Sequence, residues 1–507
     1  ANPARRHCMA ALAAGTLATW LPARSSRAAA SAPTESEALH VLNRLGFGPA
    51  PGDLAQVTEG GIDAYIAAQL QPTRLELPEP LADRLAALPT LQATQAELAL
   101  RYRAAIDAGK DGSDAGKTQQ RELFRQVALE AGEARLVLAV QSPRQLEEVL
   151  VDFWFNHFNV FSGKGLDRML MASYEREAIR PFVLGRFRDL LGATAHHPAM
   201  LFYLDNWLSS APGSRSGGRA SGLNENYARE LMELHTLGVA GGYTQRDVTE
   251  LARIFTGWSL RQQAGPDTPG GRIFRFEPRR HDAGTKQWLG HTVDPRGRAE
   301  GEWALDVLAA HPATARHVSR KLAQLFVADD PPAALVERLA GRFAQTQGDI
   351  AAVLGQLFAS PEFRDPEART PKFKTPYRYL VSALRAAGQP VAHAQPLLAA
   401  LTQLGMPLYG CATPDGYKNT QAAWLSPDAL TRRLSLATAF ATGRLLRARP
   451  ADDAGGAVPE QPAPPDASAL LAALGPAISS RTRAVVAQSE PGLQAALVLG
   501  SPDFMHH

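Results

Sequence analysis

The chain has 507 residues, of which 45% are hydrophobic and 20% charged, a balance typical of globular proteins. Its formal charge of +3 is misleading, because residues 1–32 hold four arginines and no acidic residue. Without them, Lys plus Arg falls from 53 to 49 against 50 Asp plus Glu. A net charge near −1 argues against a nucleic-acid partner, which requires a concentrated basic surface.

Residues 1–32 have the features of an export signal. Arg5 and Arg6 precede an apolar run at 9–21, and the small residues of AAASA (28–32) offer a cleavage site. The arginine pair favours twin-arginine export, with general secretion as the alternative. We therefore expect an exported protein, periplasmic or extracellular. Beyond the signal, no apolar run approaches the roughly 20 residues of a membrane span, so the mature chain should contain no transmembrane span.

Removal of the signal leaves Cys411 as the sole cysteine. A chain with one cysteine forms no internal disulfide, so an exported protein of this size depends on its hydrophobic core. We interpret Cys411, in a Gly-Cys-Ala loop, as a buried and inert thiol rather than a reactive one.

Helical periodicity dominates the chain and predicts a mainly α, large multi-helix globular fold. The charged, Gly-rich stretch 108–117 should be a loop, and Pro181 and Pro198 should divide 166–206 into two or three helices. A small β-hairpin insertion is expected around 271–290, from strands at 272–276 and 286–289. The helices predicted before residue 160 lie at 35–45, 62–70, 80–108, 118–141 and 143–158, and helices return from residue 302.

Composition divides the mature chain into a main helical domain (33–448), a linker rich in Pro and Ala (449–466) and a C-terminal helical segment (467–507) that packs back on the main domain. A Gly-rich loop at 213–222 is either a lid or a plain connector.

The most informative stretch is 224–258, NENYARELMELHTLGVAGGYTQRDVTELARIFTGW. It predicts two helices joined by a glycine-rich turn, the second capped by Thr244 with Asp247. At about 100° per residue, Asn226, Glu230 and Glu233 share one face of the first helix, whereas His235 does not.

This pattern resembles the signature of the bacterial domain-of-unknown-function 1800 family. The resemblance covers nearly the whole mature chain and implies an exported protein, often with a twin-arginine leader, whose activity is not established. The other segments that carry it are NRLGFGPAPGD (43–53), DFWFNHFNVF (152–161), LDNW (204–207), RRHDAGTKQWLG (279–290), HPATARHVSRKLAQLFV (311–327), KTPYRYLVSALRA (374–386) and MPLYGCATPDGY (406–417).

The two glutamates allow three interpretations. They form a solvated face paired with Arg229 and Arg253, or a carboxylate pair in a pocket where one is protonated and the other ionised. Alternatively they bind a divalent metal with a histidine or further acidic residues from other helices. His157 is the candidate histidine, and Asp205, His281 and Asp282 could complete such a site. The spacing fits poorly, because helix-bundle carboxylate sites carry Glu-x-x-His where this chain has Glu233.

His157 lies on an apolar stripe with Trp154, so it is either a satisfied core residue or an acid, base or ligand facing Glu230 and Glu233. The predicted catalytic residues are Glu230, Glu233, His157, Asp205, His281 and Asp282, and the predicted substrate-binding residues are Asn226, Asn156, Trp154, Trp258 and Lys374. Asn156 lies off the stripe and has an alternative role, hydrogen bonding to a neighbouring loop.

The chain lacks the HExxH, GxSxG, phosphate-binding, Rossmann and CxxCH motifs. We therefore favour an enzyme that acts on an extracytoplasmic glycan or other cell-envelope polymer by carboxylate acid–base chemistry. The alternatives are a metal- or cofactor-binding protein and a non-catalytic scaffold or partner of another exported protein.

Overall fold

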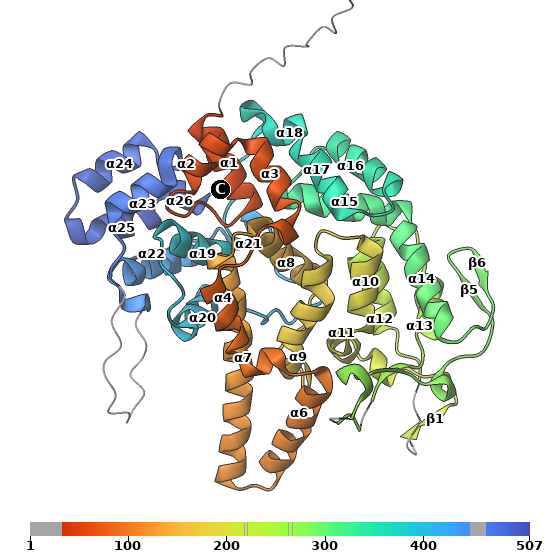
Figure 1. Cartoon of the computed structure of the whole chain (residues 1–507). Coiled ribbons are helices and arrows are strands. Elements are labelled where there is room, and N and C mark those ends of the chain that lie inside the picture. Colours follow the sequence, from red (N-terminus) through yellow and green to blue (C-terminus); the bar gives the residue numbers. More distant parts are fainter. Residues whose placement is uncertain (1–32, 217–218, 221, 262, 266, 447–462) are drawn as a thin grey trace, which may run out of the picture. The chain divides into compact units, whose positions relative to one another are not determined.

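Helices carry most of the regular structure in the computed structural model (Figure 1). It describes residues 33–446 and 463–507, apart from 217–218, 221, 262 and 266. The predicted export signal and most of the predicted linker lie outside the described residues. The mainly α fold class is confirmed. None of the described helices combines the length and apolar character needed to cross a bilayer.

The N-terminal part begins with α1 (Glu35–Leu45), whose Thr34 and Glu37 form a capping box. The helix predicted at 80–108 proved to be three helices. Leu88 is extended because Pro89 follows it, and Thr94 with Glu97 then caps a new helix. The helices that follow α1 are α2 (Asp53–Gly60), α3 (Ile62–Gln69), α4 (Glu79–Ala86), α5 (Pro89–Gln92), α6 (Gln95–Lys110) and α7 (Asp114–Gln141).

The predicted loop at 108–117 is much shorter in the structure. Helix α6 runs to Lys110, and α7 begins at Asp114 with Ser113 as its N-cap. The two helices pack against each other as a helical hairpin (Figure 1).

The middle of the chain contains two π-helical turns. The first, Glu175–Ile179, buries a charge network. The Glu175 carboxylate pairs with Arg135 and with Arg180 (2.9 Å), and it accepts a hydrogen bond from the Tyr409 hydroxyl (2.8 Å). The second is described with the candidate site. The helices here are α8 (Gln145–His157), α9 (Asp167–Tyr174), α10 (Phe187–His196), α11 (Pro198–Tyr203), α12 (Asn226–Glu230) and α13 (Gln245–Ile254).

The small β-structure appears where it was expected, but its pairing differs from the prediction. Strand β4 (Phe274–Phe276) pairs with β3 (Trp258–Leu260), and β5 (Lys286–Trp288) pairs with β6 (His291–Val293). The hairpin pairing of 272–276 with 286–289 was therefore wrong. Leu289 and Gly290 both have positive φ, as in the tight two-residue turns that join adjacent strands. A short pair, β1 (Arg215–Ser216) with β2 (Arg219–Ala220), lies in the Gly-rich loop.

Helices return after the insertion. The C-terminal helical segment (467–507) contacts the residues around α19. Phe373 and His506 form an isolated antiparallel β-bridge, and the Tyr379 hydroxyl donates a hydrogen bond to the Leu499 carbonyl (3.0 Å). The helices are α14 (Arg298–Ala310), α15 (Pro312–Phe326), α16 (Ala333–Gln345), α17 (Ile350–Phe358), α18 (Pro361–Arg364), α19 (Pro376–Ala386), α20 (Ala394–Gln403), α21 (Gln421–Trp424), α22 (Pro427–Ala441), α23 (Ala467–Leu474), α24 (Ser480–Ala487), α25 (Pro491–Leu499) and α26 (Pro502–Met505).

Close packing of α14 against the motif region gives a testable prediction. A Cβ at Gly301 would lie 2.5 Å from the buried Trp258 ring, so Gly301→Ala should destabilise the fold by about 1–3 kcal/mol. Gly341, in α16, has nothing within 4 Å of its Cβ position, and Gly341→Ala should stabilise by about 0.5–1 kcal/mol. Urea unfolding gives the free energy of unfolding of both variants. An equal change in the two variants would contradict the close packing of Gly301 against Trp258.

Candidate functional site

The first helix of the family motif changes its winding at its centre. Helix α12 ends at Glu230, and the chain continues as a π-turn, Leu231–Thr236. The Thr236 hydroxyl donates to the Leu231 carbonyl (2.6 Å), five residues back. A π-turn has more residues per turn than an α-helix, so a count of 100° per residue fails beyond Glu230. Glu233 nevertheless remains close enough to Glu230 for its charge to raise the pKa of Glu230.

Two histidine rings satisfy the carbonyls at the end of this π-turn. His157 Nε2 lies 3.0 Å from the His235 carbonyl, and His317 Nε2 lies 3.0 Å from the Leu234 carbonyl. Carbonyls in a last helical turn have no partner within the helix. Since carbonyls only accept, both Nε2 atoms carry the proton. His157 Nδ1 is then free to accept from Lys321 Nζ at 3.3 Å.

His157, His235 and His317 form a histidine cluster, with the His157 ring 6.1 Å from each of the other two. Burial, reinforced by the charge of Lys321, lowers the pKa of His235 to about 3 and that of His317 to about 4. The pKa of His157 is also lowered, for the same reasons. The cluster is therefore uncharged at neutral pH. Burial likewise lowers the pKa of Lys321 to about 8.

An acidic face, consisting of Glu230, Glu233 and Asp415, joins the motif helix to the 411–418 loop. All three side chains are half-buried. Burial raises the pKa of Glu230, the negative charges of Glu233 and Asp415 raise it further, and Arg229 opposes them. Asp415 pairs with the exposed Lys418. Glu230 thus holds its proton to higher pH than an ordinary glutamate.

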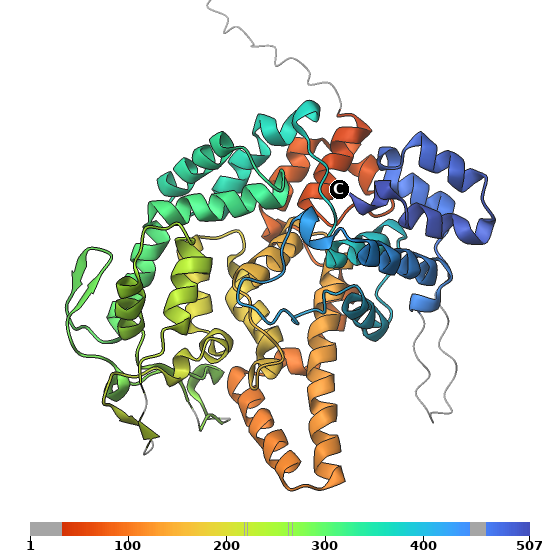
Figure 2. The same ribbon diagram turned by 180° about the vertical axis from the view of Figure 1, so that it is seen from behind.

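Asn156 in α8 and Asn159 just after it hold the 411–418 loop against α8. Asn159 Nδ2 donates to the carbonyls of Cys411 (3.0 Å) and Thr413 (2.8 Å), and Asn156 Oδ1 accepts from the Tyr417 amide (3.2 Å). Asn156 therefore holds a neighbouring loop, the alternative that its position off the apolar stripe allowed. Figure 2 shows this segment running from α20 across to the gold ribbon of α8. Cys411 is buried.

The LDNW segment borders the same region. Tyr203 donates its hydroxyl proton to the Ala412 carbonyl (2.8 Å), and the charges of Glu230 and Asp415 contribute to its raised pKa, of which burial is the main cause. Asp205 has a left-handed backbone (φ 57°) and pairs with Lys164 (2.8 Å). Asn226 Nδ2 reaches the Leu204 carbonyl at 3.4 Å, which ties this turn to the motif helix.

His281 and Asp282 belong to a different network, which holds the β-insertion on α13 and α14. His281 contacts Glu300 (3.0 Å), and Lys286 pairs with the same carboxylate (2.6 Å). Asp282 pairs with Arg253 (2.8 Å). These contacts give both residues structural partners and do not include the acidic face.

Three predicted substrate-binding residues lie in the core. Trp154 and Trp258 are fully buried, and Trp154 donates to the Val183 carbonyl (3.2 Å). Lys374 is buried against the Phe504 ring and donates to Ser382 (2.8 Å). The structure gives all three side chains packing contacts and brings none of them to the acidic face.

The predicted metal ligands Glu230, Glu233 and His157 are not assembled around one point. Both ring nitrogens of His157 are engaged in hydrogen bonds, Nε2 with the His235 carbonyl and Nδ1 with Lys321. Within the described ranges, no three His, Cys, Asp or Glu side chains are grouped so that they could hold an ion.

Residues that the sequence interpretation missed are Asp415, Lys321 and Tyr203. Asp415 and Lys321 lie inside two of the family-like segments, and Tyr203 directly precedes LDNW. The signal was therefore present. No spacing in the sequence links either segment to the glutamates, so only the folded structure shows that their charges act on one another.

These features define a helical protein in which several family-like segments meet at one acidic face backed by uncharged histidines. The family description "Protein of unknown function (DUF1800)" matches residues 40–506, so the chain belongs to the DUF1800 family. Neither a curated protein nor a solved structure gives a significant match.

The carbonyl contact of His157 predicts a stability loss on substitution. His157→Leu replaces the ring with an apolar side chain and leaves the buried His235 carbonyl without a hydrogen-bond donor. We therefore expect the free energy of unfolding in urea to fall by about 1–3 kcal/mol. His291→Leu is the control, because His291 is exposed and outside the cluster. A His157→Leu variant as stable as the control would contradict the capping role.

The lowered pKa of His235 predicts a pH dependence. Unfolded histidine binds a proton below about pH 6.5, whereas His235 in the folded state, buried and beside Lys321, has its pKa lowered to about 3. The contribution of His235 to the free energy of unfolding is therefore complete above pH 6.5 and falls as the pH drops towards 3. Between pH 7 and pH 5 the loss should be about 2 kcal/mol.

Urea unfolding at the two pH values, for wild type and His235→Leu, isolates this effect because other groups titrate in both proteins. The variant should lose less stability on acidification. An identical loss in both proteins would show that His235 is protonated in the folded state.

Proposed function

We propose that this protein is an exported enzyme that uses the acidic face for general acid–base chemistry on an extracytoplasmic glycan or cell-envelope polymer. Glu230 acts as the acid, and Glu233 or Asp415 acts as the ionised partner.

The observation that carries this proposal is the raised pKa of Glu230 beside two further carboxylates. Two carboxyl groups whose environments separate their pKa values can divide the roles of acid and base at one pH. Protonated Glu230 would donate to a leaving oxygen, while the ionised carboxylate activates a water molecule or stabilises positive charge on the sugar ring.

The substrate class follows from exposure and from the predicted compartment. Glu230, Glu233 and Asp415 are half-buried side chains that solvent still reaches, so a segment of a long polymer has access to them. The export signal predicted at 1–32 would deliver the protein to the compartment that contains envelope glycans.

Glu230→Gln tests the assignment. The amide keeps the shape and removes the titrating proton, so we expect turnover to fall about 10²- to 10⁴-fold. The assay is release of reducing ends from purified bacterial envelope glycan, and Glu337→Gln on the exposed side of α16 is the control. Unchanged turnover in both Glu230→Gln and Glu233→Gln would refute the proposal.

The pH profile separates catalysis from a structural role. An acid works while it is protonated, so activity should fall as the pH rises through the pKa of Glu230. Glu233→Gln removes a charge that raises this pKa, so the alkaline limb of its residual activity should move to lower pH. A limb at the same pH in wild type and Glu233→Gln would count against Glu230 as the acid.

A further inference from the structure

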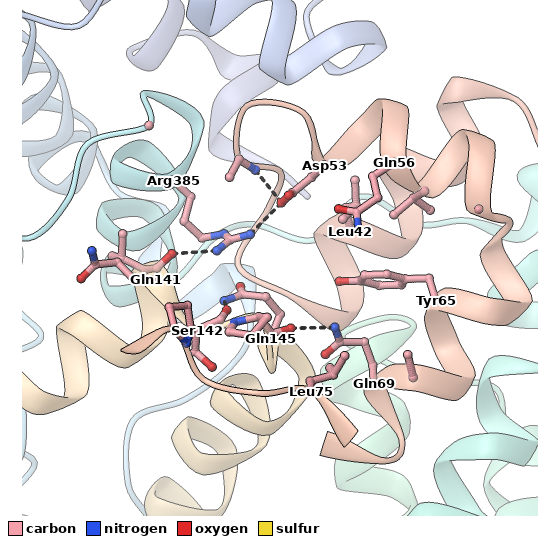
Figure 3. Close-up of a pocket in the computed structure, with 18 of the residues that line it drawn as sticks. Leu42, Asp53, Gln56, Tyr65, Gln69, Leu75, Gln141, Ser142, Gln145 and Arg385 are labelled. Carbon is pink, nitrogen blue, oxygen red and sulfur yellow. Dashed lines mark hydrogen bonds and ion pairs between the residues drawn. The ribbon is translucent and has the colours of Figure 1, made fainter. Parts of the chain in front are cut away.

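A cavity lies among the N-terminal helices, at residues distinct from the acidic face and the histidine cluster. Its volume is about 780 Å³, within the range of about 300–1,000 Å³ usual for small-molecule sites. Two family-like segments contribute to it, with Ala50 and Asp53 from 43–53 and Leu384 and Arg385 from 374–386. Figure 3 shows Asp53 and Arg385 in the wall of the cavity.

The charges in the wall neutralise each other. Among the described lining residues, Asp53 and Arg385 are the charged ones, and they form an ion pair at 2.8 Å. Arg385 also donates to the carbonyls of Gly48 (2.9 Å) and Val140 (2.8 Å). A charged ligand would therefore meet no unpaired opposite charge and would lose its hydration.

Most amide side chains in the wall are likewise engaged. The Gln69 side chain forms hydrogen bonds with the backbone of Pro143 and Leu146. The Gln145 side chain forms hydrogen bonds with the backbone of Phe47, Ala139 and Ser142. These bonds fix the shape of the cavity and leave little hydrogen-bonding capacity for a ligand. The remaining surface is largely apolar, from side chains that include Leu42, Val57, Leu75, Pro78, Val140 and Leu384.

Tyr65 is the exception. Its ring projects from α3 into the cavity (Figure 3), and among the described residues its hydroxyl has no hydrogen-bond partner. Burial raises the pKa of this hydroxyl, so it remains a donor at physiological pH. Within the part of the chain that the structure describes, the exposed residues Gln56 and Gln141 also have unengaged side-chain amides.

We infer that this cavity is a binding site for a small uncharged ligand with an apolar body and an acceptor atom that receives the Tyr65 hydroxyl proton. Neutrality follows from the closed Asp53–Arg385 pair, and the apolar body follows from the lining. The site is independent of the proposed acid–base chemistry.

The test uses prodan, an uncharged naphthalene ketone whose carbonyl is an acceptor and whose fluorescence reports transfer from water to an apolar site. We expect saturable binding with a stoichiometry of one. The anionic dye 1-anilinonaphthalene-8-sulfonate should not compete for it. Absence of saturable prodan binding would overturn the inference, and so would equally tight binding of the anion at the same site.

Two neighbouring positions on α3 provide a matched pair of variants. Ala68 lines the cavity, whereas Ala67 is exposed and does not, so Ala68→Trp should abolish binding and Ala67→Trp should leave it unchanged. Tyr65→Phe removes only the hydroxyl and should weaken binding about three- to tenfold. Thermal melting verifies folding. Binding retained in Ala68→Trp would place the dye elsewhere and overturn the inference.

Discussion

The arrangement of the candidate site depends on two hydrogen bonds to backbone carbonyls. His157 and His317, from α8 and α15, each donate to a carbonyl at the end of the π-turn. A buried carbonyl without a donor costs more than an ordinary hydrogen bond contributes, so these contacts restrain the motif helix strongly. They fix both the end of the helix and its winding, and therefore the position of Glu233 relative to Glu230.

Burial keeps the three histidines uncharged, and the hydrogen bond to the His235 carbonyl determines how His157 meets Lys321. With Nε2 engaged as a donor, His157 Nδ1 accepts from Lys321, whose side chain is half-buried. The Lys321 charge opposes protonation of all three rings, while Asp415 acts on both Lys321 and Glu230. The acidic face and the histidine cluster are thus coupled electrostatically through one lysine.

Sequence reasoning succeeded where short-range rules apply. The Thr244–Asp247 cap and the mainly α class depend on neighbours in the chain, and the structure contains both. It failed where contacts between distant residues decide. The π-turn has no local sequence mark, so the sequence predicted regular α-helical winding through Leu231–Thr236. Asp415 and Glu230 are 185 positions apart in the chain, and only the folded loop brings their charges together.

The other π-turn supports a common physical cause. Glu175 opens Glu175–Ile179 and places its carboxylate among Arg135, Arg180 and Tyr409. In both π-turns, polar groups from distant elements bind atoms that regular α-winding would direct elsewhere. A π-turn costs helical regularity, and it persists where tertiary hydrogen bonds or ion pairs offset that cost. For the motif helix, this means that the spacing of the acidic residues is imposed by α8 and α15 rather than by the helix itself.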